Sequence, residues 1–394
     1  MNITVVSPFN PSEFTNYLDK GQVIPDINKA ASSVHALIQG YLKAGHHITV
    51  ISSYDEEGAV RHISGTQLNI YLVSSFSRLP KADTFRKWYM VKRLRKELGK
   101  HLEETDVIHA QWTYEYALAA AAFAHQLPVF CTIRDWAPVI RQHQLNVKAK
   151  LMWRLVSESL FKRVMSNRHI HFIANSAYIH KLVQETYPKA KCSIIGNPIK
   201  SSLIIEERDF YPKSPVYVSI TQDLSEGRKN YHRLLQAFTL LNKDYPDAKL
   251  VLIGKIDTSC PPYTLWVEEG ITKNVEFKGF LAHDALTTIL DQASALVHPS
   301  LEESFGNTLL EGFARRLPVI GGKDSGAVPQ VLGQGKYGLL CDVANPQELM
   351  ETMKKALDTK EVLPLLARAT AFLKEEQTDI VIAEKHVRLF SQVL

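Results

Sequence analysis

Short apolar runs rich in β-branched residues alternate along the chain with longer segments of helical hydrophobic period. Six runs in the first half predict buried strands: 2–7, 47–52, 69–74, 106–112, 128–133 and 170–176. The segment 32–45, between the first two runs, has a helical pattern and ends on a glycine, a common helix terminator. Alternation of strands with helices indicates a parallel, doubly wound sheet, because parallel neighbours need a crossover between them.

The alternation stops at residues 193–215, which hold several prolines and lysines, and then starts again. Six further runs predict a second sheet: 216–221, 249–254, 275–279, 295–300, 317–322 and 338–343. We expect two Rossmann-like domains, an N-terminal one over 1–197 and a C-terminal one over 198–375, with a final helix over 376–394 that returns to the first domain. Ligands bind such sheets at the carboxyl ends of the strands, so two facing domains would enclose a central cleft.

Composition narrows the class of protein without naming a function. A chain of 394 residues with 45% hydrophobic and 22% charged residues is ordinary for a two-domain globular protein. Its four cysteines form no CxxC pair, which favours reduced thiols over a disulfide framework or a zinc site. The first residues lack the basic flank of a signal peptide, and the longest apolar run, 116–124, is too short to cross a bilayer. We therefore expect a cytoplasmic protein.

Two glycine-containing stretches have the spacing of a phosphate-binding turn. The stretch 333–338, GQGKYG, follows a helical pattern and runs into a strand, whereas a dinucleotide loop must leave a strand and open a helix. We expect no dinucleotide site there. The stretch 301–322, LEESFGNTLLEGFARRLPVIGG, has the right context, because it follows a predicted strand and Asn307 or Thr308 is expected to cap a helix. Gly306 allows backbone N–H groups to approach a ligand, and the helix N-terminus favours a phosphate.

Two carboxylates, Glu303 and Glu311, lie on either side of this turn. A carboxylate in the helix can accept both hydroxyls of a ribose, and one in the preceding loop can accept sugar hydroxyls. The arrangement therefore suits a nucleotide diphosphate sugar with its phosphates at the turn. The alternative is that Glu303 is a solvated loop residue and Glu311 a surface helix residue.

The two glutamates around Phe-Gly, followed by LPVIGG, resemble the donor site of retaining GT-B glycosyltransferases of family 4, also called group 1. Other segments are similar to the same family in the expected order: AGHHITVIS, FIANSAYIHKLV, SIIGNPI, EGRKNYHRLLQAFTLL, KLVLIG and VEFKGFL. The resemblance covers most of the chain and is strongest over 170–345. It implies an α/β GT-B fold, with two Rossmann-like, doubly wound parallel-sheet domains that face a central cleft.

The resemblance also implies roles for individual residues. Glu311 would hold the donor ribose, and Glu303 would hold the hydroxyls of the transferred sugar. Lys229, together with Arg228, would neutralise the diphosphate leaving group, where negative charge builds. Backbone groups would contact sugar and phosphate at four positions: Phe305, Gly306, Asn307 and Thr308. The nucleobase would be met by the backbone near two residues: Phe280 and Leu281.

Three positions depart from the family pattern. Asn28-Lys29 stand where two glycines are common, and Arg134 stands where a histidine is common. Arg134 is a candidate clamp for phosphate or sugar, and Asp135 is a candidate to position an acceptor hydroxyl. The arginine that usually precedes the phosphate-binding lysine has two candidate replacements, Gln222 or Arg228.

We therefore expect a retaining, metal-independent glycosyltransferase with no cofactor beyond its UDP- or GDP-sugar co-substrate. The acceptor would be a saccharide or a lipid-linked saccharide in the synthesis of bacterial surface polysaccharide or glycoconjugate. No Asp-x-Asp pair is placed to hold a metal, and we expect His109 and His298 to be hydrogen-bonded strand-end residues rather than ligands. Three alternatives stay open: a nucleotide-sugar epimerase, a phosphorylase on the same scaffold, and a non-catalytic subunit that binds sugar nucleotides.

A basic aromatic helix is predicted over residues 85–101, which hold seven Lys or Arg and one Glu. One stripe is expected to pack inward: Trp88, Val91, Leu94 and Leu98. Phe85 and Tyr89 fall on the opposite, cationic face. This pattern suits docking to the anionic inner face of a membrane, and an ordinary solvated basic face is an equal alternative. No recognition motif accompanies the charge, so we expect no nucleic-acid partner.

Overall fold

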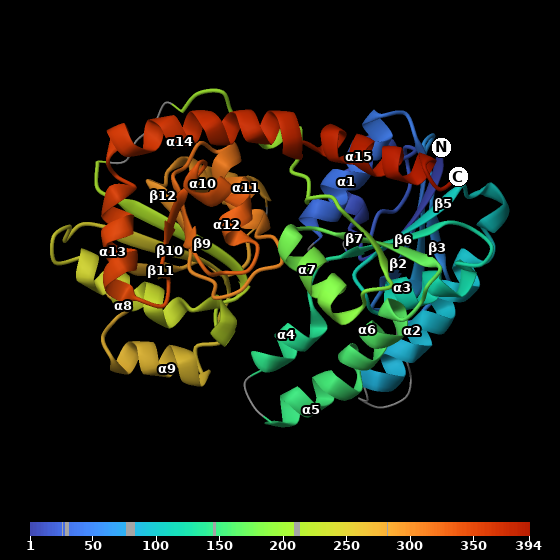
Figure 1. The fold of residues 1–394 in the computed structure, drawn as a ribbon, viewed down its shortest axis with the longest axis horizontal. Coiled ribbons are helices and arrows are strands. Elements are labelled where there is room, and N and C mark those ends of the chain that lie inside the picture. Colours follow the sequence, from blue (N-terminus) through green and yellow to red (C-terminus); the bar gives the residue numbers. More distant parts are fainter. Residues whose placement is uncertain (26, 28–30, 76–82, 145–146, 209–212, 282) are drawn as a thin grey trace. The chain divides into compact units, whose positions relative to one another are not determined.

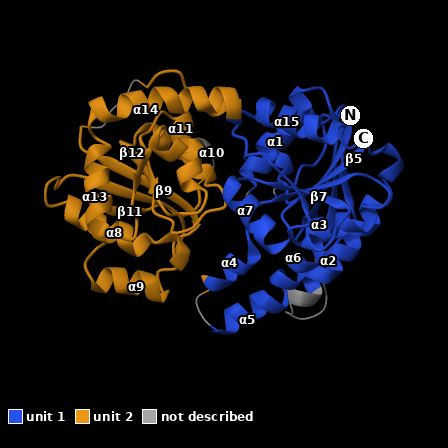
Figure 2. Cartoon of the chain, viewed as in Figure 1, with its two compact units in different colours: residues 1–142, 146–200, 377–394 blue, residues 143–145, 201–376 orange. Residues whose placement is uncertain are grey.

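The computed structural model describes the chain apart from residues 26, 28–30, 76–82, 145–146, 209–212 and 282. The described residues divide into two compact units (Figure 2). Unit 1 comprises residues 1–142, 146–200 and 377–394, and unit 2 comprises residues 143–145 and 201–376. The Asn28-Lys29 pair lies outside the described residues. Each unit contains one α/β sheet of its own (Figure 1), which confirms the predicted fold class.

Unit 1 is built on an eight-stranded sheet in the order β3-β4-β2-β1-β5-β6-β7-β8. Its strands are β1 Asn2–Val6, β2 His47–Tyr54, β3 Arg61–Ile63, β4 Leu68–Ser74, β5 Val107–Gln111, β6 Val129–Ile133, β7 Ile170–Ala174 and β8 Lys191–Ile194. All neighbours pair in parallel except β3, which pairs antiparallel to β4. The central strands are buried throughout, and such strands read as continuous apolar runs. This is why the sequence pattern identified them.

Helices cover both faces of the unit 1 sheet. They are α1 Ser32–Lys43, α2 Asp83–Leu98, α3 Glu115–Ala120, α4 Ala137–Gln142, α5 Val147–Leu155, α6 Ser157–Met165, α7 Ala177–Thr186 and α15 Asp379–Ser391. One core cluster joins the sheet to α2, α3 and α6, and its members Leu94 and Phe161 are fully buried. A second cluster joins the other face to α1 and α15, with Tyr41 and Phe390 fully buried. The sheet is thus doubly wound.

The last helix is held against α1 by a close backbone approach. A Cβ on Gly40 would lie 2.0 Å from the carbonyl oxygen of Asp379, so only glycine fits there. The buried carboxylate of Asp379 also accepts a hydrogen bond of 2.5 Å from Lys43. Helix α15 begins three residues later than expected, because Thr378 is extended and caps it by accepting from the N–H of Val381.

Unit 2 is built on a six-stranded parallel sheet in the order β11-β10-β9-β12-β13-β14. Its strands are β9 Val216–Asp223, β10 Lys249–Lys255, β11 Val275–Phe277, β12 Ala295–His298, β13 Val319–Gly322 and β14 Leu339–Cys341. Its helices are α8 Tyr231–Leu241, α9 Pro261–Glu268, α10 His283–Asp291, α11 Asn307–Ala314, α12 Val328–Val331, α13 Pro346–Lys355 and α14 Thr359–Phe372. Helices α8, α9 and α13 share one core with the sheet, and α11 packs on β12 and β13.

Two further predictions are settled by these elements. The stretch 333–338 follows α12 and leads into β14, so it lacks the strand-to-helix context of a dinucleotide loop, as predicted. In α2, Val91, Leu94 and Leu98 are buried as expected, but the prediction for Trp88 was wrong because its side chain is 37% exposed. At about 100° per residue, Trp88 lies at the edge of the buried stripe, and its ring is covered by the guanidinium of Arg163 at 4.8 Å.

Candidate active site

The turn between β12 and α11 is formed by a residue in the left-handed region. Gly306 is the N-cap of α11 with φ 91° and ψ 66°, and no side chain caps this helix. The expectation that Asn307 or Thr308 caps the helix was therefore wrong. The hydroxyl of Thr308 is within hydrogen-bond distance of His298 Nδ1, at 3.0 Å. The φ of 91° is a backbone conformation that residues with a side chain rarely adopt, so the turn favours glycine at position 306.

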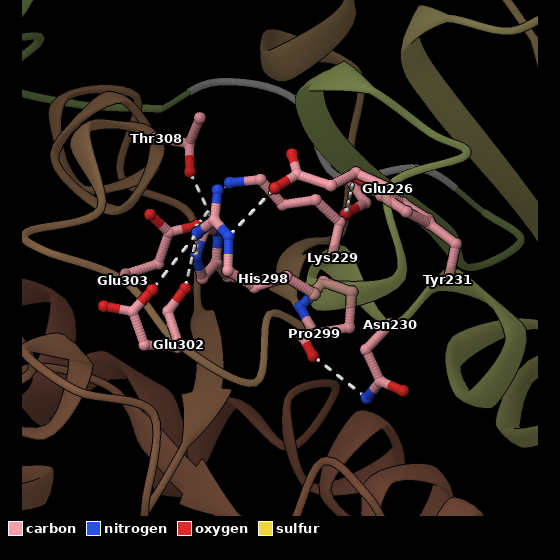
Figure 3. A network of polar contacts seen from close by, with 11 residues as sticks. Glu226, Lys229, Asn230, Tyr231, His298, Pro299, Glu302, Glu303 and Thr308 are labelled. Atoms are coloured by element: carbon pink, nitrogen blue, oxygen red, sulfur yellow. Dashed lines mark hydrogen bonds and ion pairs between the residues drawn. The ribbon is translucent and has the colours of Figure 1, made fainter. Parts of the chain in front are cut away.

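Glu303, in the loop before this turn, lies at the centre of a cationic cluster (Figure 3). Its Oε1 lies 2.5 Å from Lys229 Nζ, 3.4 Å from His298 Nε2 and 3.6 Å from Arg228 Nη1. Burial alone would raise the pKa of Glu303, but Lys229 together with the imidazole and the guanidinium holds that pKa well below its usual range. Glu303 is thus an ionised carboxylate that draws these side chains to one point.

The cations reach Glu303 because their own segment is fixed to the carboxyl ends of the strands. Lys229 ends a 3₁₀ turn, Gly227–Lys229, and Asn230 follows it in the left-handed conformation with φ 59°. The Asn230 amide donates to the carbonyls of Pro299, after β12, and Val343, after β14. The carbonyl of Arg228 accepts from the N–H of Leu301 at 2.9 Å. These bonds hold the Lys229 segment beside the Glu303 loop.

Two residues of this cluster were not assigned to the site from the sequence. His298 was expected to be a satisfied strand-end residue, and it does end β12, but both of its nitrogens face the site loop through Thr308 and Glu303. The backbone carbonyl of Glu302 accepts a hydrogen bond of 2.6 Å from Arg228. The position of His298 at the carboxyl end of a central strand was the available signal, because ligands of such sheets bind there.

Glu311 differs from Glu303 in having no hydrogen-bond or ion-pair partner among the residues that the structure describes. It lies on α11 and is partly buried. Burial raises the pKa of Glu311 to about 7. A carboxyl group that is partly buried and unpartnered in the native state is costly to ionise, and such groups occur often at functional sites.

Leu281 and Phe280 follow β11 at the carboxyl end of the unit 2 sheet. The Phe280 side chain is 61% exposed, and Leu281 is half-buried. Just before them, the carbonyl of Gly279 accepts from the N–H of Gly254, which has φ 147° at the end of β10. Phe305, by contrast, is buried with 4% exposure, so only its backbone is available to a ligand.

The two unit 1 candidates lie at the end of β6. The Arg134 side chain is buried and donates to Gln111 Oε1, Ser33 Oγ and Asn197 Oδ1 at 2.7–2.9 Å. Burial lowers the pKa of Arg134 to about 10. Asp135 accepts a hydrogen bond of 2.7 Å from the Tyr114 hydroxyl.

His109 lies in the same region of unit 1, on β5. It is fully buried, with the hydroxyls of Tyr41 and Thr132 within 3.0 Å of its two nitrogens. It is therefore hydrogen-bonded on both sides, as expected. Within the described ranges, no three His, Cys, Asp or Glu side chains are grouped so as to hold a metal ion.

Two family models match the chain. Residues 30–203 match the model described as Glycosyltransferase Family 4, and residues 200–370 match the one described as Glycosyl transferases group 1. The two matches together span residues 30–370. The chain belongs to the family 4 glycosyltransferases. It is therefore a retaining glycosyltransferase with the GT-B fold, and its family uses nucleotide-sugar donors.

Two relatives illustrate the sequence similarity of this family 4 enzyme to other proteins. It is 22% identical over 348 residues to an uncharacterized glycosyltransferase of Methanocaldococcus jannaschii, a match that covers 86% of this chain and 87% of that protein. It is 26% identical over 199 residues to N-acetyl-alpha-D-glucosaminyl L-malate synthase of Bacillus anthracis, covering 48% of this chain and 51% of that one.

Solved structures share the fold over the full chain. Sucrose-phosphate synthase from Thermosynechococcus elongatus matches with a TM-score of 0.76 at 16% identity, covering 100% of this chain and 99% of that chain. Anabaena HepE, solved in complex with UDP and glucose, matches with a TM-score of 0.70 at 16% identity, covering 100% of both chains. In the part of the family 4 chain that the structure describes, no helix is long and apolar enough to cross a membrane.

Proposed function

We propose that this family 4 enzyme binds a nucleotide diphosphate sugar at the unit 2 cluster and transfers the sugar to a saccharide or lipid-linked saccharide of a surface polysaccharide or glycoconjugate. One observation carries the proposal. Lys229 and Arg228 converge on the buried carboxylate of Glu303, in the loop before α11. Glu311, on α11, has a raised pKa and no partner among the described residues. A ligand that carries both negative charge and paired hydroxyls fits both features.

The diphosphate would take the place that Glu303 now holds beside the cations. Lys229 and Arg228 would neutralise the phosphates, and backbone groups of residues 305–308 would complete the cradle at the start of α11. Two cations and the helix N-terminus supply positive charge where the leaving group becomes negative, so we propose that no metal ion is required. Glu303, relieved of Lys229, would accept hydroxyls of the transferred sugar.

The nucleoside would bind further along the same edge of unit 2. Glu311 would accept the two ribose hydroxyls, which would give its buried carboxylate the hydrogen bonds it lacks. The backbone at Phe280 and Leu281 would meet the base. Because this contact is made by backbone groups, the side chains described here do not select between UDP- and GDP-sugars.

Unit 1 would receive the acceptor. We propose that Asp135 positions the attacking hydroxyl and that Arg134 is a positioning residue, since its donors already hold Gln111, Ser33 and Asn197. The acceptor oxygen would form its bond to the anomeric carbon on the face from which the diphosphate leaves. The hydroxyl proton would pass to the departing phosphate oxygen, and the configuration of the sugar would be retained.

Thermal stabilisation by nucleotides tests this proposal directly. A ligand that binds only the native state at a hundred times its dissociation constant stabilises the protein by about 2.7 kcal/mol. We expect UDP or GDP and the matching sugar conjugate to raise the melting temperature without added metal and in the presence of EDTA. Stabilisation only with a divalent cation would overturn metal independence, and no stabilisation by any nucleoside diphosphate would overturn the donor site.

A further inference from the structure

Helix α5 carries an apolar stripe on its solvent-exposed side. Val147, Leu151 and Leu155 are 82%, 52% and 60% exposed. They are spaced four residues apart, so they lie along one face of the helix. Single exposed apolar residues are common, but three in register on one helix face form a continuous strip that water solvates poorly.

Three cations flank this stripe, and the helix contains no acidic residue. At about 100° per residue, Lys148 lies on one side of the stripe, and Lys150 and Arg154 lie on the other. All three are exposed, and none has an acidic partner within the described ranges of the chain. The outer face of α5 is thus an apolar centre between two positively charged edges.

The opposite face of α5 accounts for its packing in unit 1. Trp153 donates to the carbonyl of Ala137 on α4 at 2.9 Å, and its ring meets Tyr114 edge-on. Helix α5 also packs against α6 (Figure 1). These contacts fix the orientation of the helix, so the exposed stripe is a stable feature of the surface rather than an unformed part of the core.

Several cations of helix α2, the segment expected from its sequence to dock on a membrane, already have partners within the protein. Arg86 pairs with Asp55 at 2.7 Å, and Lys100, just after the helix, pairs with Glu97 at 2.6 Å. Arg93 donates to the carbonyl of Gly58 and to the Tyr89 hydroxyl. The buried side of α2 packs in the core of unit 1. Lys92, Arg95 and Lys96 of α2 remain exposed, but its exposed aromatic rings, Trp88 and Tyr89, each lie against an arginine guanidinium. Helix α5 instead combines exposed cations with an apolar stripe of three residues.

We propose that α5 docks this enzyme on the surface of an anionic lipid bilayer. The stripe of Val147, Leu151 and Leu155 would enter the boundary between headgroups and acyl chains, and the flanking cations would contact lipid phosphates. An amphipathic helix with basic edges and an apolar face lies in the membrane plane in this manner. Each cation near such a surface contributes about fivefold to binding, so three contribute about a hundredfold. No residue of the unit 2 cluster takes part.

Vesicle cosedimentation tests this proposal. The purified full-length protein is mixed with vesicles of phosphatidylglycerol and phosphatidylcholine, or with phosphatidylcholine alone. We expect binding to the anionic vesicles that falls with added salt and is at least tenfold weaker on neutral ones. The double variant Leu151→Asp with Leu155→Asp should lower binding at least tenfold. Leu363→Asp is the matched control, because that leucine is 50% exposed on α14, and it should bind as the parent does.

Other outcomes would overturn the proposal. One is that the parent does not bind, and another is that the α5 variant binds as well as the control. A third is that Arg93→Glu with Lys96→Glu abolishes binding while the α5 changes do not, which would place docking on α2. If the parent is dimeric without lipid and the α5 variant is monomeric, the stripe binds a second copy of the chain instead. All variants should keep the nucleotide affinity of the parent, so failure here is distinguishable from failure of the donor site.

Discussion

Glu311→Gln should make the free enzyme more stable at alkaline pH and should weaken its binding of the donor nucleotide. Burial raises the folded-state pKa of Glu311 from 4.5 to about 7, so between these values the folded state binds more protons than the unfolded state. Stability therefore falls as pH rises from about 4.5 to about 7, and above pH 7 the folded protein carries an unpartnered carboxylate. Glutamine has nearly the same shape and no charge to desolvate.

The pKa difference sets an upper limit on the stability that Glu311→Gln adds. A difference of 2.5 pH units (7 − 4.5) corresponds to at most about 3 kcal/mol, and partial exposure of the side chain reduces this to about 1–2 kcal/mol. We expect the variant to be more stable than the parent by this amount at pH 8, with the difference close to zero at pH 4, below the unfolded-state pKa. Urea titration at both pH values measures it. Glu268→Gln, an exposed glutamate on α9, is the matched control and should change nothing.

Donor binding should move in the opposite direction. The carboxylate form accepts the ribose hydroxyls, so nucleotide affinity of the parent should rise as pH passes through about 7. The variant should bind more weakly by about 1.5–3 kcal/mol, the scale of hydrogen bonds to a charged group. Calorimetry at pH 6 and pH 8 gives both quantities. An unchanged affinity would refute the ribose assignment, and an unchanged stability at pH 8 would refute the account of a partly buried, unpartnered carboxyl.

Three further substitutions test the surrounding structure. Gly306→Ala places alanine at a φ of 91° with its Cβ 2.9 Å from Leu309 Cδ1. We expect it to destabilise unit 2 by about 1–3 kcal/mol and to weaken nucleotide binding, both measured by thermal shifts with and without ligand. Gly40→Ala should release α15 from α1, measured as faster proteolytic loss of the C-terminal helix, whereas an unchanged digestion pattern would contradict the close approach to Asp379. Arg134→Met should destabilise unit 1 by about 2–4 kcal/mol because buried polar partners are left unpaired, with nucleotide affinity unchanged; full stability with lost affinity would make Arg134 a ligand contact instead.

The strands that position the site were predictable because most are buried on both faces. Such strands are continuous apolar runs, and the twelve predicted runs all contain strands of the two sheets. The strands that were missed, β3 and β8, are edge strands of three and four residues with exposed or half-exposed positions. Their residues carry no apolar run, so only pairing with a neighbour identifies them.

The chemistry of the candidate site was less predictable than its location. Sequence spacing placed Glu303 and Glu311 around the turn, but the opposite shifts of their pKa values depend on neighbours far along the chain. Lys229 lies 74 residues from Glu303, and the amide of Asn230 bonds to a carbonyl 113 residues away. The cap of α11 was missed because a glycine with positive φ replaced the expected side-chain cap.

Calorimetric titration of Lys229→Met with a nucleoside diphosphate and with the corresponding nucleoside tests the central claim most directly. The claim is that the cations around Glu303 receive the donor's diphosphate. The parent should bind the diphosphate at one site per chain, and the variant should bind it at least tenfold more weakly while its affinity for the nucleoside stays the same. Equal affinity of the parent and the variant for the diphosphate would contradict the account.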